Sequence, residues 1–277
     1  MKIAFIGGGN MARAIISGLC AKGFAGGDIA VKDPHAEKRE FFAKTYGVKG
    51  YETAGNWIGE ADLVVLAVKP QVLEACLKEI AGLISEKATV LSIAAAVSVE
   101  ALVRWSGKSH IVRCLPNTPA MVGSGFSGLF AGSGADAADR ERAQTVMQSV
   151  GECAWFEKED ALHLVTAGPG SGPAYVFLFM QGLSEALVKA GAEPEAARKL
   201  AIATVSGAAN LAASSYASFE ELRAMVTSKG GTTARTIEAF EAGDLRGLIG
   251  RAVEACIARS REMAELYNLN SRDFHAS

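Results

Sequence analysis

The stretch IAFIGGGNMARAI, residues 3–15, decides the fold of this chain. A short apolar segment runs into three glycines, and apolar residues then repeat at helical spacing, at Ala12, Ile15, Ile16 and Leu19. Gly7 permits a tight turn, Gly9 leaves room for a pyrophosphate beside the backbone, and the small Ala12 lets a helix approach a strand. The pattern predicts a strand, a phosphate-binding loop and a helix whose unpaired N–H groups face the phosphates. A purely structural turn is the alternative, because a G-x-G-x-x-A match is weak on its own.

The chain that follows alternates short β-branched segments with helical patterns. The predicted strands are Ile3–Ile6, Ile29–Lys32, Leu63–Val68, Thr89–Ile93, Ile111–Cys114, Gly128–Ala131 and Cys153–Phe156. A second helical face is predicted at Val72, Ala75, Cys76 and Ile80. This alternation predicts an open, mostly parallel sheet with helices on both faces, an α/β Rossmann-type dinucleotide-binding domain over residues 1–159.

Beyond residue 160 the strand signal stops, and residues 160–277 are predicted to form an all-α C-terminal domain. Pro173 and Pro194 suit the first turns of two helices. Ser218 and Glu221 have the spacing of a capping box, and Asp244 precedes the last helical pattern as a capping residue.

The segment Glu195–Ala213 is apolar or small on every side. A helix of this kind is normally buried all round, and one small helical domain hardly encloses it. We therefore expect a homodimer through the C-terminal helices. The alternative is a central helix buried within its own chain.

Composition excludes several classes of protein. The chain has 277 residues, 49% of them hydrophobic, and a formal charge of -2, which argues against disorder and against nucleic-acid binding. Asn10 and Arg13 interrupt the apolar N-terminus before a signal peptide forms, and no apolar stretch is long enough to span a membrane, so we expect a cytoplasmic location and no membrane partner. The five cysteines lack C-x-x-C spacing and the four histidines are isolated, so no metal is expected.

Asp33 directly follows the second predicted strand, where an acidic residue normally accepts hydrogen bonds from the adenosine ribose and disfavours a 2′-phosphate. Basic residues surround Asp33, at Lys32, His35, Lys38 and Arg39. We expect NADPH as the cofactor, with NADH as the alternative, and with Asp33 turned away or capping the next helix.

Other strand ends supply the same edge of the sheet, in AVKP (67–70), SIAAAV (92–97) and RCLPNTPAMVGSG (113–125). Loops at this edge shape a nicotinamide pocket. The residues predicted to bind the cofactor are Gly7, Gly9, Asn10, Met11, Lys32, Val68, Lys69, Pro70, Ala95 and Asn117. For Asn117, ordinary turn chemistry between two prolines is the alternative.

Five motifs in this order, FIGGGNM, AVKP, LPNTPA, GSGPAY (170–175) and KGGTT (229–233), resemble the pyrroline-5-carboxylate reductases over nearly the whole chain. The resemblance implies reduction of 1-pyrroline-5-carboxylate to L-proline with NADPH or NADH. It also implies a Rossmann domain, a helical domain that forms an intertwined dimer, and further assembly into larger rings. Two positions depart from the family pattern, with Lys229 where proline is usual and Ala96 where glycine is usual.

The KGGTT motif precedes a helical pattern over Thr233–Glu241, so its N–H groups are expected to form an anion-binding nest for the substrate carboxylate. By similarity, Gly230, Gly231 and Thr232 bind the carboxylate through backbone donors, and Ser228 adds a hydroxyl. Thr233 is the predicted catalytic residue, facing the ring nitrogen. The active site is then expected between the domains, and a plain Gly-Gly turn is the alternative.

Two other functions stay open on the sequence alone. One is a hydroxyacid or imine dehydrogenase with the same pair of domains, although the helical lysine that those enzymes place near the substrate is not evident here beyond Lys189 and Lys199. The other is a sensor that binds NADP(H) without turnover, which would need the glycine loop but no carboxylate nest.

Overall fold

The computed structural model of the chain describes residues 1–269. Tertiary contacts divide the chain into two compact units, which we call unit 1 and unit 2. Unit 1 consists of Met1–Gly170 together with the chain from Cys256 onward, and unit 2 is Ser171–Ala255. These units describe packing; the division into functional domains at residues 1–159 and 160–277 stays a prediction.

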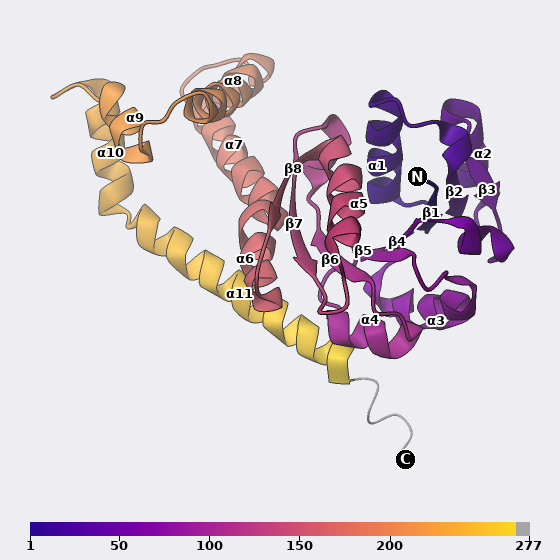
Figure 1. Cartoon of the computed structure of the whole chain (residues 1–277). Helices are drawn as coiled ribbons and strands as arrows, with labels where there is room; N and C mark the ends of the chain where they lie inside the picture. Colours follow the sequence, from indigo (N-terminus) through magenta and orange to yellow (C-terminus); the bar gives the residue numbers. More distant parts are fainter. Residues whose placement is uncertain (270–277) are drawn as a thin grey trace. The chain divides into compact units, whose positions relative to one another are not determined.

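Unit 1 is built on one eight-stranded sheet in the order β3-β2-β1-β4-β5-β6-β7-β8 (Figure 1). Its strands are β1 (Ile3–Ile6), β2 (Ile29–Lys32), β3 (Lys49–Tyr51), β4 (Leu63–Leu66), β5 (Thr89–Ser92), β6 (Ile111–Leu115), β7 (Gly125–Ala131) and β8 (Gly151–Trp155). Neighbouring strands are parallel except for β6 and β7. The first six strands in the order 3-2-1-4-5-6 form a Rossmann sheet, which confirms the predicted fold.

The strand prediction has one omission and several shifted ends. The edge strand β3 was not predicted, because its three residues, Lys49-Gly50-Tyr51, are too short and too exposed to show an alternating pattern. Strand β7 begins three residues earlier than predicted, at Gly125, since small residues give a weak strand signal there. Strand β8 also begins earlier, at Gly151.

Helices cover both faces of the sheet. They are α1 (Asn10–Ala21), α2 (Ala36–Tyr46), α3 (Pro70–Ile80), α4 (Val99–Ser106) and α5 (Ala137–Met147). One core contains apolar residues of α1, α2 and α5, and a second core on the other face contains those of α3 and α4. The predicted face of α1 is confirmed, because Ala12, Ile15, Ile16 and Leu19 are all buried.

The predicted face of α3 is partly wrong. The structure buries Leu73, Leu77 and Ile80, at i, i+4 and i+7, while Val72 is half exposed. Since Val72 and Leu73 are adjacent apolar residues, two faces one position apart fit the sequence, and packing against the sheet selects the leucines.

The rest of unit 1 joins the end of the chain to this sheet. Helix α6 (Leu162–Val165) and the last part of α11 (Leu245–Leu269) belong to unit 1. The His163 ring Nδ1 lies 2.7 Å from the Ser260 hydroxyl, and Arg261 donates to Asp160 at 2.9 Å. These contacts fasten the C-terminal helix to the sheet domain.

Unit 2 is entirely helical within its described residues, with α7 (Gly172–Lys189), α8 (Pro194–Ala213), α9 (Phe219–Met225), α10 (Thr232–Ala242) and the start of α11. Pro173 and Pro194 lie in the first turns of α7 and α8. The Ser218 and Glu221 capping box is present. The Asp244 carboxylate accepts a hydrogen bond from the Gly247 amide at 3.3 Å, so the predicted cap of α11 is confirmed.

Helix α8 is not buried within its own chain. Only Ala197 and Ala201 of this helix are buried, and Leu200 and Leu211 are about half exposed. The alternative of a central helix enclosed by its own chain is therefore wrong for the part of the chain that the structure describes. None of the described helices has the length and apolarity needed to cross a membrane.

Candidate functional site

The glycine loop between β1 and α1 is fixed by contacts that leave no room for side chains at its start. Gly7 has φ +103°, and a Cβ atom there would lie 2.7 Å from the Ala67 carbonyl oxygen. The Gly7 amide donates to the Lys32 carbonyl oxygen at 2.8 Å. Only glycine satisfies both the positive φ and the close backbone approach.

Gly9 and the start of α1 have free space around them, whereas Gly7 is packed against the backbone. A Cβ atom at Gly9 would have no neighbour within 4 Å. Gly9 is the N-cap of α1, no side chain caps this helix, and its first turn contains no acidic residue. The first-turn amides, which have no intrahelical acceptor, and the positive end of the helix dipole therefore favour an anion, as a pyrophosphate requires.

A hollow of about 500 Å³ adjoins this loop. Its lining residues are Gly8, Gly9, Asn10, Arg13, Glu37, Lys38, Phe41 and Phe42. The predicted cofactor residues Gly9 and Asn10 lie here, and Met11 follows in the same turn of α1. The cradle and its donors fit a dinucleotide phosphate, so these residues are the candidates to hold it.

Asp33, at the end of β2, does not face an open ribose site. One of its carboxylate oxygens accepts hydrogen bonds from the Gly8 amide at 2.9 Å and from Lys38 Nζ at 3.1 Å. The other accepts from the His35 amide at 3.0 Å. Asp33 is 4% exposed. Burial alone would raise its pKa, but these hydrogen bonds and the Lys38 charge outweigh burial and hold the pKa below its usual value.

Two of the four predicted basic residues make ion pairs outside the hollow. Lys32 pairs with Glu79 of α3 at 2.7 Å. Arg39 donates to the Asp33 carbonyl oxygen at 2.8 Å and pairs with Glu52 at 3.2 Å. Of the four basic residues predicted around Asp33, only Lys38 lines the hollow.

Sequence reasoning missed Arg13, which lines the same hollow from the second turn of α1. Its guanidinium lies 4.1 Å from the centroid of the Phe41 ring of α2, a cation–π contact. The sequence contained a signal for this position, because Arg13 is the one charged residue of α1 and follows the glycine loop closely.

The remaining predicted cofactor residues lie in loops at the ends of β4, β5 and β6. Lys69 is exposed and is the N-cap of α3, Pro70 occupies the first turn, and Val68 is half-buried. Ala95 is exposed in the loop after β5. These placements are compatible with cofactor contact, which stays a prediction for each.

Asn117 has a structural role. Its side-chain amide donates to the Pro169 carbonyl oxygen at 2.9 Å, and its oxygen accepts from the Phe126 amide at 2.8 Å. Asn117 is 8% exposed. The side chain thus ties the loop after β6 to strand β7 and to the segment that contains Pro169, which favours the turn alternative for its side chain.

The predicted substrate loop lies in unit 2, where Gly231 is the N-cap of α10. No side chain caps this helix, and its first turn contains no acidic residue. Gly230 has φ +74°, and the Gly231 amide donates to the Ser228 carbonyl oxygen at 3.0 Å. The turn therefore uses the Gly231 amide itself, and the amides of Thr232 and Thr233 in the first turn are the stronger candidates for a carboxylate.

The side chains of this loop differ in exposure. Ser228, Lys229 and Thr232 are exposed, whereas Thr233 is half-buried. The loop has the backbone geometry of an anion site, and the assignment of Thr233 to the ring nitrogen stays a prediction.

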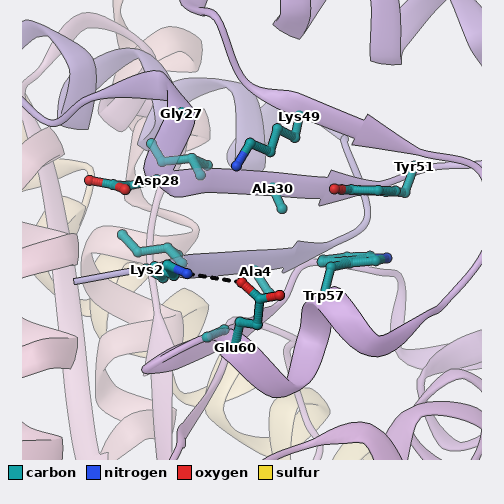
Figure 2. Close-up of a pocket in the computed structure, with 12 residues that line it drawn as sticks. Lys2, Ala4, Gly27, Asp28, Ala30, Lys49, Tyr51, Trp57 and Glu60 are labelled. Atoms are coloured by element: carbon teal, nitrogen blue, oxygen red, sulfur yellow. Dashed lines mark hydrogen bonds and ion pairs between the residues drawn. The ribbon is translucent and has the colours of Figure 1, made fainter.

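A second hollow in unit 1, of about 130 Å³, is a poorer candidate (Figure 2). Tyr51 stacks on Trp57 with ring centroids 4.5 Å apart, and Lys2 pairs with Glu60 at 2.9 Å. The hollow is too small for a dinucleotide, and its charges at Lys2 and Glu60 neutralise each other.

Comparisons with known proteins agree with these features. Residues 2–96 match the family model described as NADP oxidoreductase, coenzyme F420-dependent. Residues 159–263 match the model described as pyrroline-5-carboxylate reductase dimerisation. The sheet order, the glycine loop and these matches define an NAD(P)-dependent oxidoreductase with a helical dimerisation region, and they support a homodimer.

Relatives identify the family. The pyrroline-5-carboxylate reductase of Pseudomonas aeruginosa is 40% identical, over 95% of this chain and 97% of its own length. The solved structure of such a reductase from Coxiella burnetii has a TM-score of 0.91 and 40% identity, covering 95% of this chain and 98% of its own. The Plasmodium falciparum enzyme, solved with NADP bound, has a TM-score of 0.82 and 26% identity, with 95% and 98% coverage. The chain belongs to the pyrroline-5-carboxylate reductase family.

Proposed function

We propose that this chain reduces the C=N bond of 1-pyrroline-5-carboxylate to give L-proline. The observation that carries the proposal is sequence similarity: the chain is 40% identical, over 95% of its length, to a reductase named for this substrate. The open N-terminus of α10 supports it, because a substrate carboxylate needs such donors. NADPH or NADH supplies the hydride.

The chemistry asks little of the protein beyond orientation. A protonated imine is already electrophilic, and correct positioning lowers a bimolecular barrier by roughly 7 to 11 kcal/mol. Ser228, Gly230, Gly231 and Thr232 would hold the carboxylate, with the Gly231 amide shared with its own turn. The Thr233 hydroxyl would hydrogen-bond the ring nitrogen and help it keep its proton.

The assembly and location belong to the same proposal. The exposed apolar faces of unit 2 support association beyond the single chain, and we propose larger rings built from the homodimer. We also propose a cytoplasmic location, which the thiols of Cys20, Cys76, Cys114 and Cys153 support, because the cytoplasm keeps thiols reduced.

The first test is oxidation of NADPH by the purified protein with 1-pyrroline-5-carboxylate, beside NADH and beside hydroxyacid and other cyclic imine controls. Turnover that yields proline is the expected result. Reaction with only a hydroxyacid or another imine would leave the fold and overturn the substrate, and NADPH binding without any turnover would favour a sensor.

The predicted role of Thr233 is tested in the same assay. We expect Thr233→Ala to lower kcat about 100-fold or more while the Kd for NADPH stays unchanged, because the hydroxyl acts only on the substrate nitrogen. Thr236→Ala is the matched control, since the Thr236 hydroxyl bonds the Thr232 carbonyl oxygen within α10. Unchanged kcat in Thr233→Ala would contradict the role.

A further inference from the structure

The hollow beside the glycine loop contains a cation that no carboxylate neutralises among the described ion pairs. Arg13 is exposed and lines the hollow, and its guanidinium lies over Phe41 at 4.1 Å. A cation held over an aromatic ring keeps its charge and loses little freedom when it binds a phosphate. Arg13 is therefore ready to take an anionic group that enters this hollow.

Asp33 lacks the role that its position in the sequence suggests. An acidic residue at the end of the second strand discriminates against NADP only when its carboxylate faces the ribose hydroxyls. Here both oxygens already accept hydrogen bonds, from the Gly8 and His35 amides and from Lys38. Its negative charge is balanced inside this cluster, so it holds the loop rather than reading the ribose.

On the proposed function, which this inference deepens, we propose that Arg13 is the residue that distinguishes NADPH from NADH, by binding the 2′-phosphate of the adenosine. Lys38 lines the same hollow with its charge paired to Asp33, and Asp33 is a positioning residue that holds Gly8 and Lys38 in place. Arginine suits this task because its planar fork matches phosphate oxygens.

Glu37 is the opposing charge in the hollow, on the first turn of α2. It is exposed, so water screens much of its repulsion. The N-terminus of α2, which no side chain caps, adds a positive dipole end at the same place. The balance of charge thus favours an anion at Arg13, and Glu37→Gln is expected to strengthen its binding further.

The test compares two ligands that differ by one phosphate, adenosine 2′,5′-bisphosphate and 5′-AMP, by titration calorimetry on the full-length protein. We expect the wild type to prefer the bisphosphate, and Arg13→Gln to weaken bisphosphate binding roughly 10- to 100-fold with little change for 5′-AMP. The affinities for NADPH and NADH should behave in the same way: Arg13→Gln should weaken NADPH binding and leave NADH binding nearly unchanged. Arg140→Gln is the matched control, because Arg140 lies over the Trp155 ring at 4.8 Å outside this hollow.

Asp33→Asn separates positioning from discrimination. If Asp33 read the ribose, removing its charge would raise affinity for the bisphosphate alone. As a positioning residue, its loss should weaken both ligands together, because the Gly8 amide and Lys38 lose their anchor.

Equal loss of both ligands in Arg13→Gln, no loss in either, or no bisphosphate preference in the wild type would each overturn the proposal. These outcomes are independent of the substrate. A protein that prefers the bisphosphate through Arg13 but does not reduce 1-pyrroline-5-carboxylate would refute the proposed function and leave this inference standing.

Discussion

Units 1 and 2 of this chain bury their apolar residues to very different degrees. Unit 1 encloses two cores, one on each face of its sheet, in which Phe5, Ile15 and Leu66 are wholly inaccessible. Among the described residues of unit 2, the buried apolar side chains are Ala197 and Ala201. A sheet covered on both faces completes its core within one chain, whereas these helices leave apolar faces exposed, in a region that matches a dimerisation model.

The two glycine turns also differ in how far along the chain their hydrogen-bond partners lie. The cofactor loop is held by residues distant in sequence, through the Lys32 carbonyl oxygen and the Asp33 carboxylate. The turn before α10 is held by the Ser228 carbonyl oxygen, three residues away. Unit 1 therefore positions its loop through a tertiary network within the chain, and the stability of unit 2 is expected to depend on the dimer.

The sharpest way to break this comparison is to place a charge on the apolar face of unit 2. Phe177 is 64% exposed and lines a hollow with Met180 and Ile202. Phe177→Glu should raise the dimer dissociation constant at least about 100-fold, because burying an unpaired carboxylate costs several kcal/mol. Sedimentation over a dilution series measures this constant.

Val103→Glu is the control for that variant, since Val103 is 38% exposed on α4 of unit 1. It should leave the dimer intact. A Phe177→Glu protein that dissociates no more readily than the control would show that the exposed face of α7 is not the interface.

Two glycine substitutions sharpen the comparison within the cofactor loop. Gly9→Ala should fold normally, because its Cβ meets nothing, but raise the Kd for NADPH roughly 10-fold or more by filling the space of the pyrophosphate. Gly7→Ala should instead destabilise unit 1 by about 2 kcal/mol or more, because its Cβ meets the Ala67 carbonyl oxygen at positive φ. Cofactor titration and urea unfolding separate the two effects, and equal stabilities would contradict the closed geometry at Gly7.

Much of unit 1 is predictable from local sequence, and the charged contacts are not. The strand β1, the glycine loop and the buried face of α1 follow from residues 3–19, because backbone turn and helical spacing are local properties. The roles of Lys32 and Arg39 depend on Glu79 and Glu52, which are distant along the chain and close only once the sheet has formed. Asp33 has the sequence position of a ribose ligand, yet the folded loop gives it another role.

A buried polar cluster in unit 1 provides the next prediction. Asp139 is fully buried and accepts hydrogen bonds from Thr89 at 2.5 Å and from the Asp136 amide at 2.8 Å, and it lies 2.7 Å from His110 Nδ1. His110, described from the sequence as isolated, is therefore part of this cluster. Asp139→Asn should cost about 2 to 3 kcal/mol of unfolding free energy, because one buried donor loses its partner.

The pH dependence of that cost follows from the pKa of Asp139. Burial alone would raise the pKa, but the hydrogen bonds from Thr89, Asp136 and His110 outweigh it and hold the pKa below its usual value. A lowered pKa stabilises the fold above the unfolded value of about 3.9, and the stabilisation is lost as the pH falls through the folded value. The difference between wild type and Asp139→Asn should thus shrink below about pH 4. The control variant is Glu141→Gln, at an exposed position on the same helix.

The smallest expected effect compares two residues with positive φ, one in each unit. Asp244 of unit 2, at φ +53°, gains hydrogen bonds from the Gly247 amide and from Arg251 that offset its conformation. Ala96 of unit 1, at φ +67°, has only a methyl group and stands where the family pattern has glycine.

Ala96→Gly should therefore stabilise unit 1 by about 0.5 to 1 kcal/mol, the αL penalty of alanine less the backbone entropy of glycine. Asp244→Gly should change stability by only a few tenths of a kcal/mol and in the unfavourable direction. Urea midpoints at one fixed protein concentration measure both, and a destabilised Ala96→Gly would mean that packing of the methyl group outweighs its backbone strain.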